Sequence, residues 1–324
     1  MALYPAAALT ARRAFVTGAG GQDGSYLTEL LLDRGYEVVG LVRDRELAYP
    51  NLERVRDRIE LVSANLLDGD VLASLLRTHR PAEIYNLASP SFVPRSWDHP
   101  VETAEFAAVG VTSLLEAVRA VDPTVRVYQA SSSEIFGEPA EVPQTETTPL
   151  APVTPYGVAK AYGHFIVGSY RRRYGLHASA GVLYNHESPR RPETFLPSKV
   201  AHAVARIVSG GQRELLLGDL DARRDWGYAP DYVDAMWRML QQDEPGDYVV
   251  ATGELHSVQD LVQCAFDHVG LDWRDHVRSD DSLKRGQAEL HQLVGDAAKA
   301  RAKLGWQPSV TFDELVGLLV NAAA

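Results

Sequence analysis

The chain has 324 residues, of which 45% are hydrophobic and 23% charged, and its formal net charge is −11. These values are ordinary for a globular enzyme, and the length allows one large α/β domain with a smaller unit beside it. The acidic balance argues against a nucleic-acid or anionic-membrane partner, because surfaces that bind phosphate backbones need a broad basic field. An anionic small substrate would require a local group of cations.

The single cysteine, Cys264, excludes an intramolecular disulfide. Its apolar, helical surroundings favour a small buried hydrophobe over a nucleophile. Residues 1–10 lack the basic region of a signal peptide, and no apolar run approaches the ~18 residues of a membrane span. We therefore expect a cytoplasmic protein that binds neither nucleic acid nor membrane.

In the first two-thirds of the chain, short apolar runs alternate with longer amphipathic stretches. The helices expected there include 26–32 and 112–121, and the expected strands are 14–17, 37–42, 59–62, 83–87 and 126–130. This alternation predicts an α/β fold with a Rossmann-type, doubly wound parallel sheet covered by helices on both faces. Ligands of such sheets bind beyond the carboxyl ends of the strands.

After about residue 183 the rhythm changes, because prolines punctuate a loop-rich stretch and the later elements are shorter. Helices are expected at about 199–208 and 311–320. We expect residues 1–183 to form the Rossmann domain, with a later contribution from about 214–250. Residues 184–324 are expected to form mainly a smaller α/β domain that binds the substrate.

Residues 17–24, Thr-Gly-Ala-Gly-Gly-Gln-Asp-Gly, join the first expected strand to the first helix. Gly18, Gly21 and Gly24 stand where a side chain would block the tight turn, a pyrophosphate or the packing of strand on helix. Phosphate oxygens would then lie at the helix N-terminus. Because the motif falls within a βαβ unit, it predicts a dinucleotide cofactor rather than an ordinary glycine-rich loop.

The end of the second strand bears on the choice between NAD and NADP. NAD-binding folds usually place a carboxylate there for the ribose hydroxyls, whereas this strand closes with Arg43, which suits a 2′-phosphate. Asp44 follows at once and weakens the positive field, and a solvated surface arginine is the alternative. The sequence favours NADP without excluding NAD.

Tyr156 and Lys160 form the next signal. Pro155 suits the first turn of a helix, which puts the two side chains four residues apart on one face. A nearby ammonium and a positive nicotinamide ring both favour the phenolate form of a tyrosine. Such a pair alone would be ordinary surface amphipathicity, but together with the glycine loop it indicates a redox site.

Residues 131–134, Ser-Ser-Ser-Glu, directly follow the strand that ends at Ala130. A hydroxyl at this edge of the sheet can hydrogen-bond a reacting oxygen beside Tyr156. Glu134 is more informative, because a simple dehydrogenase or epimerase needs no carboxylate here, whereas removal of water needs a base and an acid. The alternative is a helix N-cap or a surface acid.

Together these motifs resemble the GDP-mannose 4,6-dehydratase family of extended short-chain dehydrogenases. The resemblance covers nearly the whole chain and is closest at residues 18–26, 128–134, 185–191, 217–227, 231–237 and 249–257. It implies that the Rossmann domain binds NADP and that the second domain binds mainly the nucleotide sugar.

The resemblance also assigns roles to individual residues. Ser132, usually threonine in the family, matches the catalytic hydroxyl, Glu134 matches the base, and Tyr156 with Lys160 matches the redox pair. The implied cofactor contacts are Gly18, Gly21, Gln22, Asp23, Gly24, Arg43, Asn65, Leu66, Leu87, Ala88, Tyr156, Lys160, His186 and Arg191. The implied substrate contacts are Ser91, Ser132, Asn185, Lys199, Arg224, Arg285 and Glu289, with no metal site. For Arg224 the planar five-donor guanidinium independently suits phosphate oxygens.

Several positions depart from the family pattern. Residues 86–91 read Asn-Leu-Ala-Ser-Pro-Ser in place of Asn-Leu-Ala-Ala-Gln-Ser, and Asn65 replaces an aspartate. Ser198 stands where the family has an arginine, and Arg285 is displaced by one residue. A double arginine that takes part in the family's tetramer contacts is interrupted, as Arg-Asp-Arg, at 43–45. The catalytic set is therefore intact, whereas the nucleotide pocket and the oligomer contacts differ.

The function that the resemblance implies is conversion of GDP-mannose to GDP-4-keto-6-deoxymannose by an internal NADP redox cycle, in a homodimer or homotetramer. Tyr156 would take the proton of the C4 hydroxyl as hydride passes to NADP, and Glu134 would take the C5 proton as water leaves C6 and hydride returns there. The alternatives are an NADPH-dependent nucleotide-sugar reductase or epimerase, a 4,6-dehydratase acting on another nucleotide sugar, or a non-enzymatic dinucleotide sensor.

Overall fold

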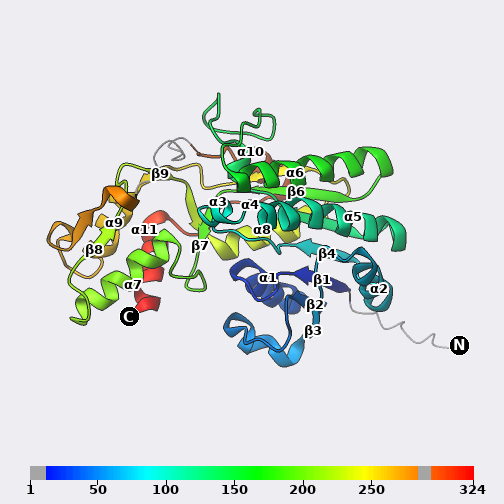
Figure 1. Cartoon of the computed structure of the whole chain (residues 1–324), viewed down its shortest axis with the longest axis horizontal. Coiled ribbons are helices and arrows are strands. Elements are labelled where there is room, and N and C mark those ends of the chain that lie inside the picture. Colours follow the sequence, from blue (N-terminus) through cyan, green and yellow to red (C-terminus); the bar gives the residue numbers. More distant parts are fainter. Residues whose placement is uncertain (1–11, 284–292) are drawn as a thin grey trace, which may run out of the picture.

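The computed structural model describes residues 12–283 and 293–324, and its main body is a seven-stranded parallel sheet in the order β11-β6-β5-β4-β1-β2-β3 (Figure 1). The strands are β1 (Arg13–Thr17), β2 (Glu37–Val42), β3 (Glu60–Ser63), β4 (Glu83–Asn86), β5 (Arg126–Ala130), β6 (Ala178–Leu183) and β11 (Asp247–Val250). Each apolar run that was expected to be a strand is one, within a residue at either end. The predicted doubly wound parallel sheet is confirmed.

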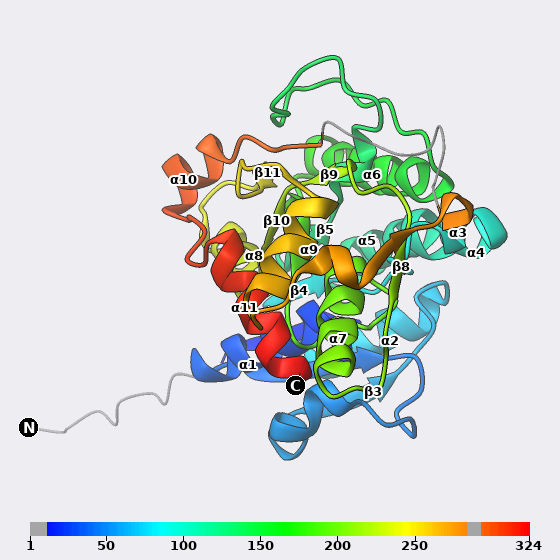
Figure 2. The ribbon, with the colours of Figure 1, turned by 90° about the vertical axis from the view of Figure 1, so that its left-hand side faces the viewer.

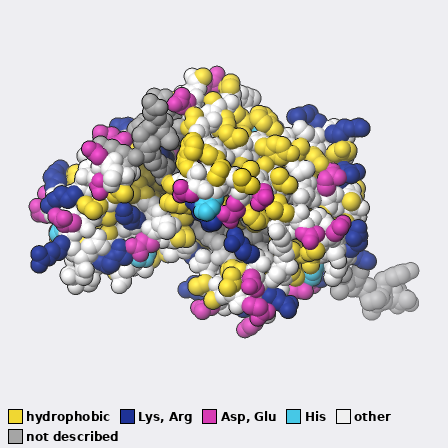
Figure 3. All heavy atoms as spheres, viewed as in Figure 1, with side chains coloured by type: hydrophobic (Ala, Val, Ile, Leu, Met, Phe, Trp, Pro, Cys, Tyr) yellow, Lys and Arg dark blue, Asp and Glu magenta, His cyan; other side chains and the backbone are white. Residues whose placement is uncertain are grey.

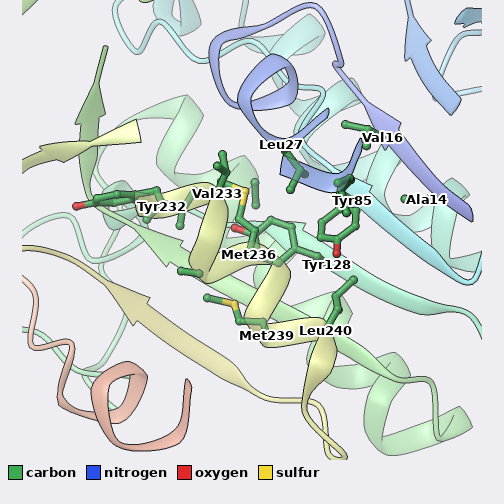
Figure 4. Close-up of a cluster of buried hydrophobic side chains, with 14 of the residues drawn as sticks. Ala14, Val16, Leu27, Tyr85, Tyr128, Tyr232, Val233, Met236, Met239 and Leu240 are labelled. Carbon is green, nitrogen blue, oxygen red and sulfur yellow. The ribbon is translucent and has the colours of Figure 1, made fainter. Parts of the chain in front are cut away.

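Helices cover both faces of this sheet because neighbouring residues of its strands point to opposite sides. On β1, Ala14 and Val16 pack with α1 (Gln22–Asp33), α8 (Ala229–Gln241) and α10 (Ala298–Leu304). Phe15 packs on the other face with α2 (Gly69–His79), α5 (Gly110–Val121) and α6 (Pro155–Tyr174). Figure 4 shows the first of these cores, in which side chains of α8 meet Leu27, Tyr85 and Tyr128.

Short helical segments connect the larger elements. They are η1 (Pro50–Arg58), α3 (Arg95–Asp98), α4 (Pro100–Ala104), η2 (Glu105–Val109), η3 (Ser133–Ile135), η4 (Trp273–Asp275) and η5 (Asp281–Leu283). Among the described residues, no helix is both long and apolar enough to cross a membrane.

The second, smaller body lies at one end of the sheet, where α7 (Leu196–Val208), α9 (Val258–Asp267) and α11 (Phe312–Ala323) share one hydrophobic core (Figures 1 and 2). Two-stranded ladders hold it together: β7 (Asn185–Glu187) with β10 (Trp226–Tyr228), β9 (Arg223–Arg224) with β12 (His256–Ser257), and β8 (Leu215–Leu217) with β13 (Val277–Ser279). Cys264 is half-buried against this core, and burial raises its pKa to about 11. Its setting is that of a hydrophobe rather than a nucleophile.

The chain crosses between the two bodies more than once. After β10 it returns to the large sheet as α8 and β11, and after the second body's β13 it returns again as α10, which packs on β11 and α8. Residues 229–250 therefore belong to the sheet, whereas β8, β9 and β10 belong to the smaller ladders. The strand ends of the sheet and the smaller body consequently face each other across one cleft.

Candidate active site

Two connected pockets lie at the carboxyl ends of the strands. The inner pocket, a cavity of about 310 Å³, is lined by the glycine loop and by the ends of β4, β5 and β6. The outer pocket, of about 500 Å³, extends from there towards α7 and β10. Five residues line both pockets, so that a ligand can span them: Ser91, Val93, Glu134, Asn185 and Arg191.

The glycine loop leaves a cradle that side chains would fill. Gly18 has φ +68°, and a Cβ there would lie 3.0 Å from the backbone of Ala88. A Cβ on Gly24 would lie 2.2 Å from the carbonyl oxygen of Gly18, so only glycine lets α1 approach the sheet this closely. Gly21 is the N-cap of α1 and offers no side-chain cap to the first-turn N–H groups. Those donors fit the diphosphate of a dinucleotide.

Side chains at the N-terminus of α1 bind this helix to β7. The Nε2 atom of His186 lies 2.8 Å from Oδ2 of Asp23. The Gln22 amide donates to the carbonyl oxygen of His186 at 3.2 Å, and the Ser188 hydroxyl donates to Oε1 of Gln22 at 2.8 Å. The cofactor loop is thereby fixed against the segment that carries the family-like Asn-His-Glu-Ser-Pro residues.

The Asp23–His186 pair shifts the pKa values of both groups. Burial acts to raise the pKa of Asp23, but the charge and hydrogen bond of His186 outweigh it and lower the value to about 2. Burial likewise opposes protonation of His186, yet the Asp23 carboxylate raises the pKa of this imidazole above its ordinary value. The pair is therefore ionic at mildly acidic pH.

The four residues with implied catalytic roles line the inner pocket together. Ser132 accepts a hydrogen bond from the backbone N–H of Glu134 at 3.3 Å, and its side chain is hydrogen-bonded to the phenol of Tyr156. Lys160 lies one helical turn after Tyr156, with its Nζ 5.6 Å from the centre of the phenol ring. The ammonium donates to the carbonyl oxygen of Ala130 at 3.1 Å. The carboxylate of Glu134 and the phenol of Tyr156 thus share one small cavity.

In the protein chain without a cofactor, the pKa of Tyr156 is not lowered. Burial raises the pKa of Tyr156 to about 12, against which the hydrogen bond with Ser132 acts only in part, and Glu134 raises it further. Burial also lowers the pKa of Lys160 to about 8. Desolvation therefore decides the pKa of Tyr156 in the chain alone, and a further positive charge in the pocket, as the expected nicotinamide ring would bring, is needed to favour the phenolate.

Thr154 is a site residue that the sequence analysis missed. It is the N-cap of α6, where its hydroxyl accepts from the N–H of Gly157 at 2.9 Å. The same hydroxyl lies 3.5 Å from Oε2 of Glu134 and donates to it. A threonine directly before Pro155 is a recognisable helix start, so the cap was predictable, although its contact with Glu134 was not.

Four of the implied substrate residues lie along the outer pocket or at its junction with the inner one. Asn185, Lys199 and Arg224 line it, and Ser91 lies where it joins the inner pocket. The Lys199 ammonium donates to the carbonyl oxygen of Leu216 at 2.9 Å. Ser198, which stands in place of the family's arginine, donates its hydroxyl to the carbonyl oxygen of Arg191 at 3.0 Å. Position 198 therefore supplies a backbone contact instead of a cation.

Not every implied contact lies at these pockets. Arg43 is exposed at the end of β2, and Asn65 and Leu66 follow β3; none of the three lines the inner pocket, whereas Leu87 and Ala88 do. Arg285 and Glu289 fall outside the described residues. Within residues 12–283 and 293–324 no group of His, Cys, Asp or Glu side chains is arranged to hold a metal ion.

Comparison with known proteins gives one family over almost the whole chain. A family model described as GDP-mannose 4,6 dehydratase matches residues 15–319. GDP-mannose 4,6 dehydratase 1 of Arabidopsis thaliana is 46% identical, over 95% of this chain and 88% of the relative. The human GDP-mannose 4,6 dehydratase is 43% identical, over 95% of this chain and 90% of its own length. The Vibrio cholerae enzyme is 40% identical, with 95% and 93% covered.

Solved structures share the fold over the same length. A dTDP-glucose 4,6-dehydratase from Streptomyces venezuelae, with NAD and TYD bound, aligns with a TM-score of 0.85 at 26% identity, over 96% of each chain. A UDP-glucose 4-epimerase from Thermotoga maritima aligns with a TM-score of 0.85 at 24% identity, over 96% of this chain and 98% of the other. The resemblance drawn from the sequence motifs is confirmed: this chain belongs to the GDP-mannose 4,6-dehydratase family.

Proposed function

We propose that the chain is an NADP-dependent nucleotide-sugar 4,6-dehydratase that converts GDP-mannose to GDP-4-keto-6-deoxymannose. One observation carries the proposal beyond family membership. Glu134 lines the same cavity as Tyr156 and is close enough to raise the pKa of the phenol. A dehydrogenase or epimerase has no use for a second acid–base group at this point, whereas dehydration requires one.

The inner pocket suits NADP as the bound cofactor. The glycine cradle and the uncapped start of α1 fit its diphosphate. Arg43 at the end of β2 is the cation available for a 2′-phosphate. When bound, the cofactor supplies a hydride acceptor that returns the same hydride before product leaves, so that net oxidation is zero.

The chain's own residues then divide the proton transfers between them. Tyr156 accepts the proton of the C4 hydroxyl, and Ser132 is hydrogen-bonded to the phenol at that point. The ketone at C4 acidifies the C5 proton, which Glu134 removes. The same carboxyl group returns that proton to the C6 hydroxyl, which departs as water. As the hydride returns to C6, the proton that Tyr156 holds passes to C5, so that both residues regain their starting protonation states. Thr154, at 3.5 Å, orients the carboxylate for both transfers.

The outer pocket suits the nucleotide part of the substrate. Lys199 and Arg224 bring positive charge to the outer pocket, which Glu134 also lines, and cations of this kind suit a diphosphate. Asn185 lies at the junction of the two pockets. Arg285 and Glu289 complete the proposed substrate contacts.

A homodimer is the assembly that the surface supports best. Val158, Tyr162 and Phe165 of α6 are between 47% and 59% exposed and follow one another at helical spacing. Val101 on α4 is also exposed, and Figure 3 shows hydrophobic side chains gathered over the part of the molecule that Figure 1 labels α3, α4 and α6. An apolar surface of this kind is typical of a protein interface.

Mass spectrometry of the protein incubated with GDP-mannose tests the proposed activity. We expect a product lighter by one water, formed without stoichiometric consumption of NADPH. A product of unchanged mass would indicate an epimerase, and NADPH consumed mole for mole would indicate a reductase. Dehydration of a different nucleotide sugar, with GDP-mannose untouched, would contradict the assigned substrate while retaining the reaction.

A further inference from the structure

Glu187 is a buried carboxylate that the mechanism above does not use. It is the last residue of β7, its side chain is only 3% exposed, and it lines the outer pocket in which Glu134 and Asn185 also lie. Within the part of the chain that the structure describes, its Oε2 atom has no hydrogen-bond partner. A buried acceptor without a hydrogen-bond partner is unusual in a folded protein, because it has lost its hydrogen bonds to water and has not replaced them with others.

Arg191 lies beside Glu187 and opposes its negative charge, but it does not donate a hydrogen bond to Oε2. The Nε atom of Arg191 lies 3.5 Å from Oε2 of Glu187, and this Nε likewise makes no hydrogen bond to any described residue. The Arg191 guanidinium instead lies 3.6 Å above the ring of Phe195. Burial raises the pKa of Glu187, while Arg191 and His186 act to lower it. Both members of the pair therefore keep hydrogen-bonding capacity at the wall of a ligand cavity.

Packing does not account for a carboxylate at this position. The pairing of β7 with β10 uses backbone groups, with Glu187 opposite Tyr228. The same pocket is lined by Phe92, Phe195 and Trp226, among which an apolar side chain would be cheaper to bury. The acid is therefore better explained by a polar ligand group than by the fold.

The reaction restricts which ligand group this can be. In a 4,6-dehydration the C4 hydroxyl becomes a ketone, the C6 hydroxyl leaves and C1 carries the nucleotide. Only the hydroxyls on C2 and C3 of the hexose pass through unchanged, and both are hydrogen-bond donors.

We propose that Glu187 is a specificity-determining residue, whose carboxylate accepts a hydrogen bond from the C2 or C3 hydroxyl of the hexose. The inference rests on the proposed function. The contact holds the sugar ring with its C4–C6 edge towards Tyr156 and Glu134. A hexose that lacks this hydroxyl leaves the carboxylate unpaired and is discriminated against.

The test combines a protein change with a ligand change. Removing the recognised hydroxyl, as the 2-deoxy or 3-deoxy analogue of GDP-mannose, should lower kcat/KM of the wild type by about 10- to 100-fold, the usual range for a hydrogen bond to a charged group. Glu187→Ala should lower kcat/KM for GDP-mannose by a similar factor. With the matching deoxy analogue, however, the variant should lose nothing more, because the contact is already gone.

If Glu187 had a purely structural role, the loss of kcat/KM caused by Glu187→Ala and the loss caused by the deoxy sugar would multiply, with the 2-deoxy and with the 3-deoxy analogue alike. That result would overturn the proposal. Glu187→Gln keeps the shape and one acceptor oxygen, so it should fold and fall between wild type and Glu187→Ala. Glu193→Gln, the same change at a 45% exposed carboxylate, should behave as the wild type.

Calorimetry separates failure of this inference from failure of the proposed function. Glu187→Ala should bind GDP as tightly as the wild type and GDP-mannose more weakly. If the wild type does not dehydrate GDP-mannose, the proposed function fails. If Glu187→Ala binds GDP-mannose as tightly as the wild type, the role of Glu187 fails, whatever the turnover measurements show.

Discussion

At the residue scale, the proposed chemistry depends on Glu134, which is partly buried and receives a hydrogen bond from Thr154. Glu134→Gln keeps the shape of the side chain but cannot take a proton. We expect product formation to fall by about 10²- to 10⁴-fold, the usual contribution of a general base. Cofactor affinity, measured by fluorescence titration, should stay the same.

Glu138 offers a matched control, because it lies in the same loop but is exposed. Glu138→Gln should leave product formation unaltered. If Glu134→Gln forms product at the wild-type rate, this carboxylate is not the base.

The Asp23–His186 pair predicts a pH-dependent contribution to stability. Because the folded-state pKa of Asp23 is lowered from 3.8 to about 2, its contribution is present above 3.8 and is lost as the pH falls towards 2. Because the pKa of His186 is raised above 6.5, its contribution is complete below 6.5 and is lost as the pH rises through the folded-state value. The pair therefore stabilises the fold most between these limits.

Asp23→Asn should accordingly lower the unfolding temperature most near pH 5.5, by roughly 5 °C or more. The loss should be smaller at an alkaline pH above the folded-state pKa of His186, where the imidazole is neutral in both states. Asp33→Asn, at the exposed far end of the same helix, should change the unfolding temperature equally at both pH values. An equal loss at both pH values for Asp23→Asn would show that the pair is not ionic. Differential scanning calorimetry measures all three proteins.

At the scale of elements, α1 can approach the glycine loop only because Gly24, in the first turn of this helix, has no side chain. A Cβ at position 24 would lie 2.2 Å from the Gly18 oxygen and 2.7 Å from Cα of Ala19, and both are backbone atoms that cannot turn aside. Gly24→Ala should therefore displace the helix start and weaken cofactor binding by about 10-fold or more, at a cost of about 1–3 kcal/mol in stability.

Gly69→Ala is the control for this change, since a Cβ on Gly69, at the start of α2, meets nothing within 4 Å. It should bind cofactor like the wild type and unfold at the same or a slightly higher temperature. Cofactor titration of the two variants decides the matter. Unchanged affinity in Gly24→Ala would mean that the helix start does not bind the diphosphate.

The helices and strands also show which parts of the fold could be predicted from sequence patterns. Buried apolar runs such as 38–42 predicted five of the seven strands of the large sheet, because a strand covered on both faces has to be largely apolar. The strands β8, β9 and β12 were not predicted. They are only two or three residues long and exist because a distant segment pairs with them, which no local pattern encodes.

The candidate active site, like the fold, could be predicted only in part from the sequence. The rule that strand ends converge correctly brought Glu134 and Tyr156 into one cavity. The pairing of Asp23 with His186, 163 residues apart, and the orphaned oxygen of Glu187 could not be predicted, because they depend on side-chain positions. The raised pKa of Tyr156 in the chain without cofactor could not be predicted for a related reason: the cost of burial is not visible in a spacing of four residues.

At the scale of the whole molecule, the exposed apolar stripe on α6 makes the proposed dimer testable. Phe165, 59% exposed, should be buried between subunits, so that Phe165→Glu places a charge in the interface and yields monomers. Val208→Glu makes the same kind of change at a 58% exposed residue of α7 and should leave the assembly intact. Light scattering coupled to size exclusion measures the mass of each. A wild-type monomer at micromolar concentration, or a dimeric Phe165→Glu, would refute this interface.

Because all steps of the proposed reaction take place in one cleft, the hydrogen atoms of the substrate can be followed from one carbon to another. The Tyr156 phenol and the Glu134 carboxylate line one cavity, so that C4, C5 and C6 of one hexose react without the sugar leaving. The hydrogen taken from C4 should therefore be found in the same sugar molecule, at C6.

GDP-mannose that carries deuterium at C4 measures this most directly. We expect NMR and mass spectrometry to find the label retained in the product, in the methyl group at C6. Deuterium that remains at C4, or that is released from the sugar, would contradict an internal redox dehydration.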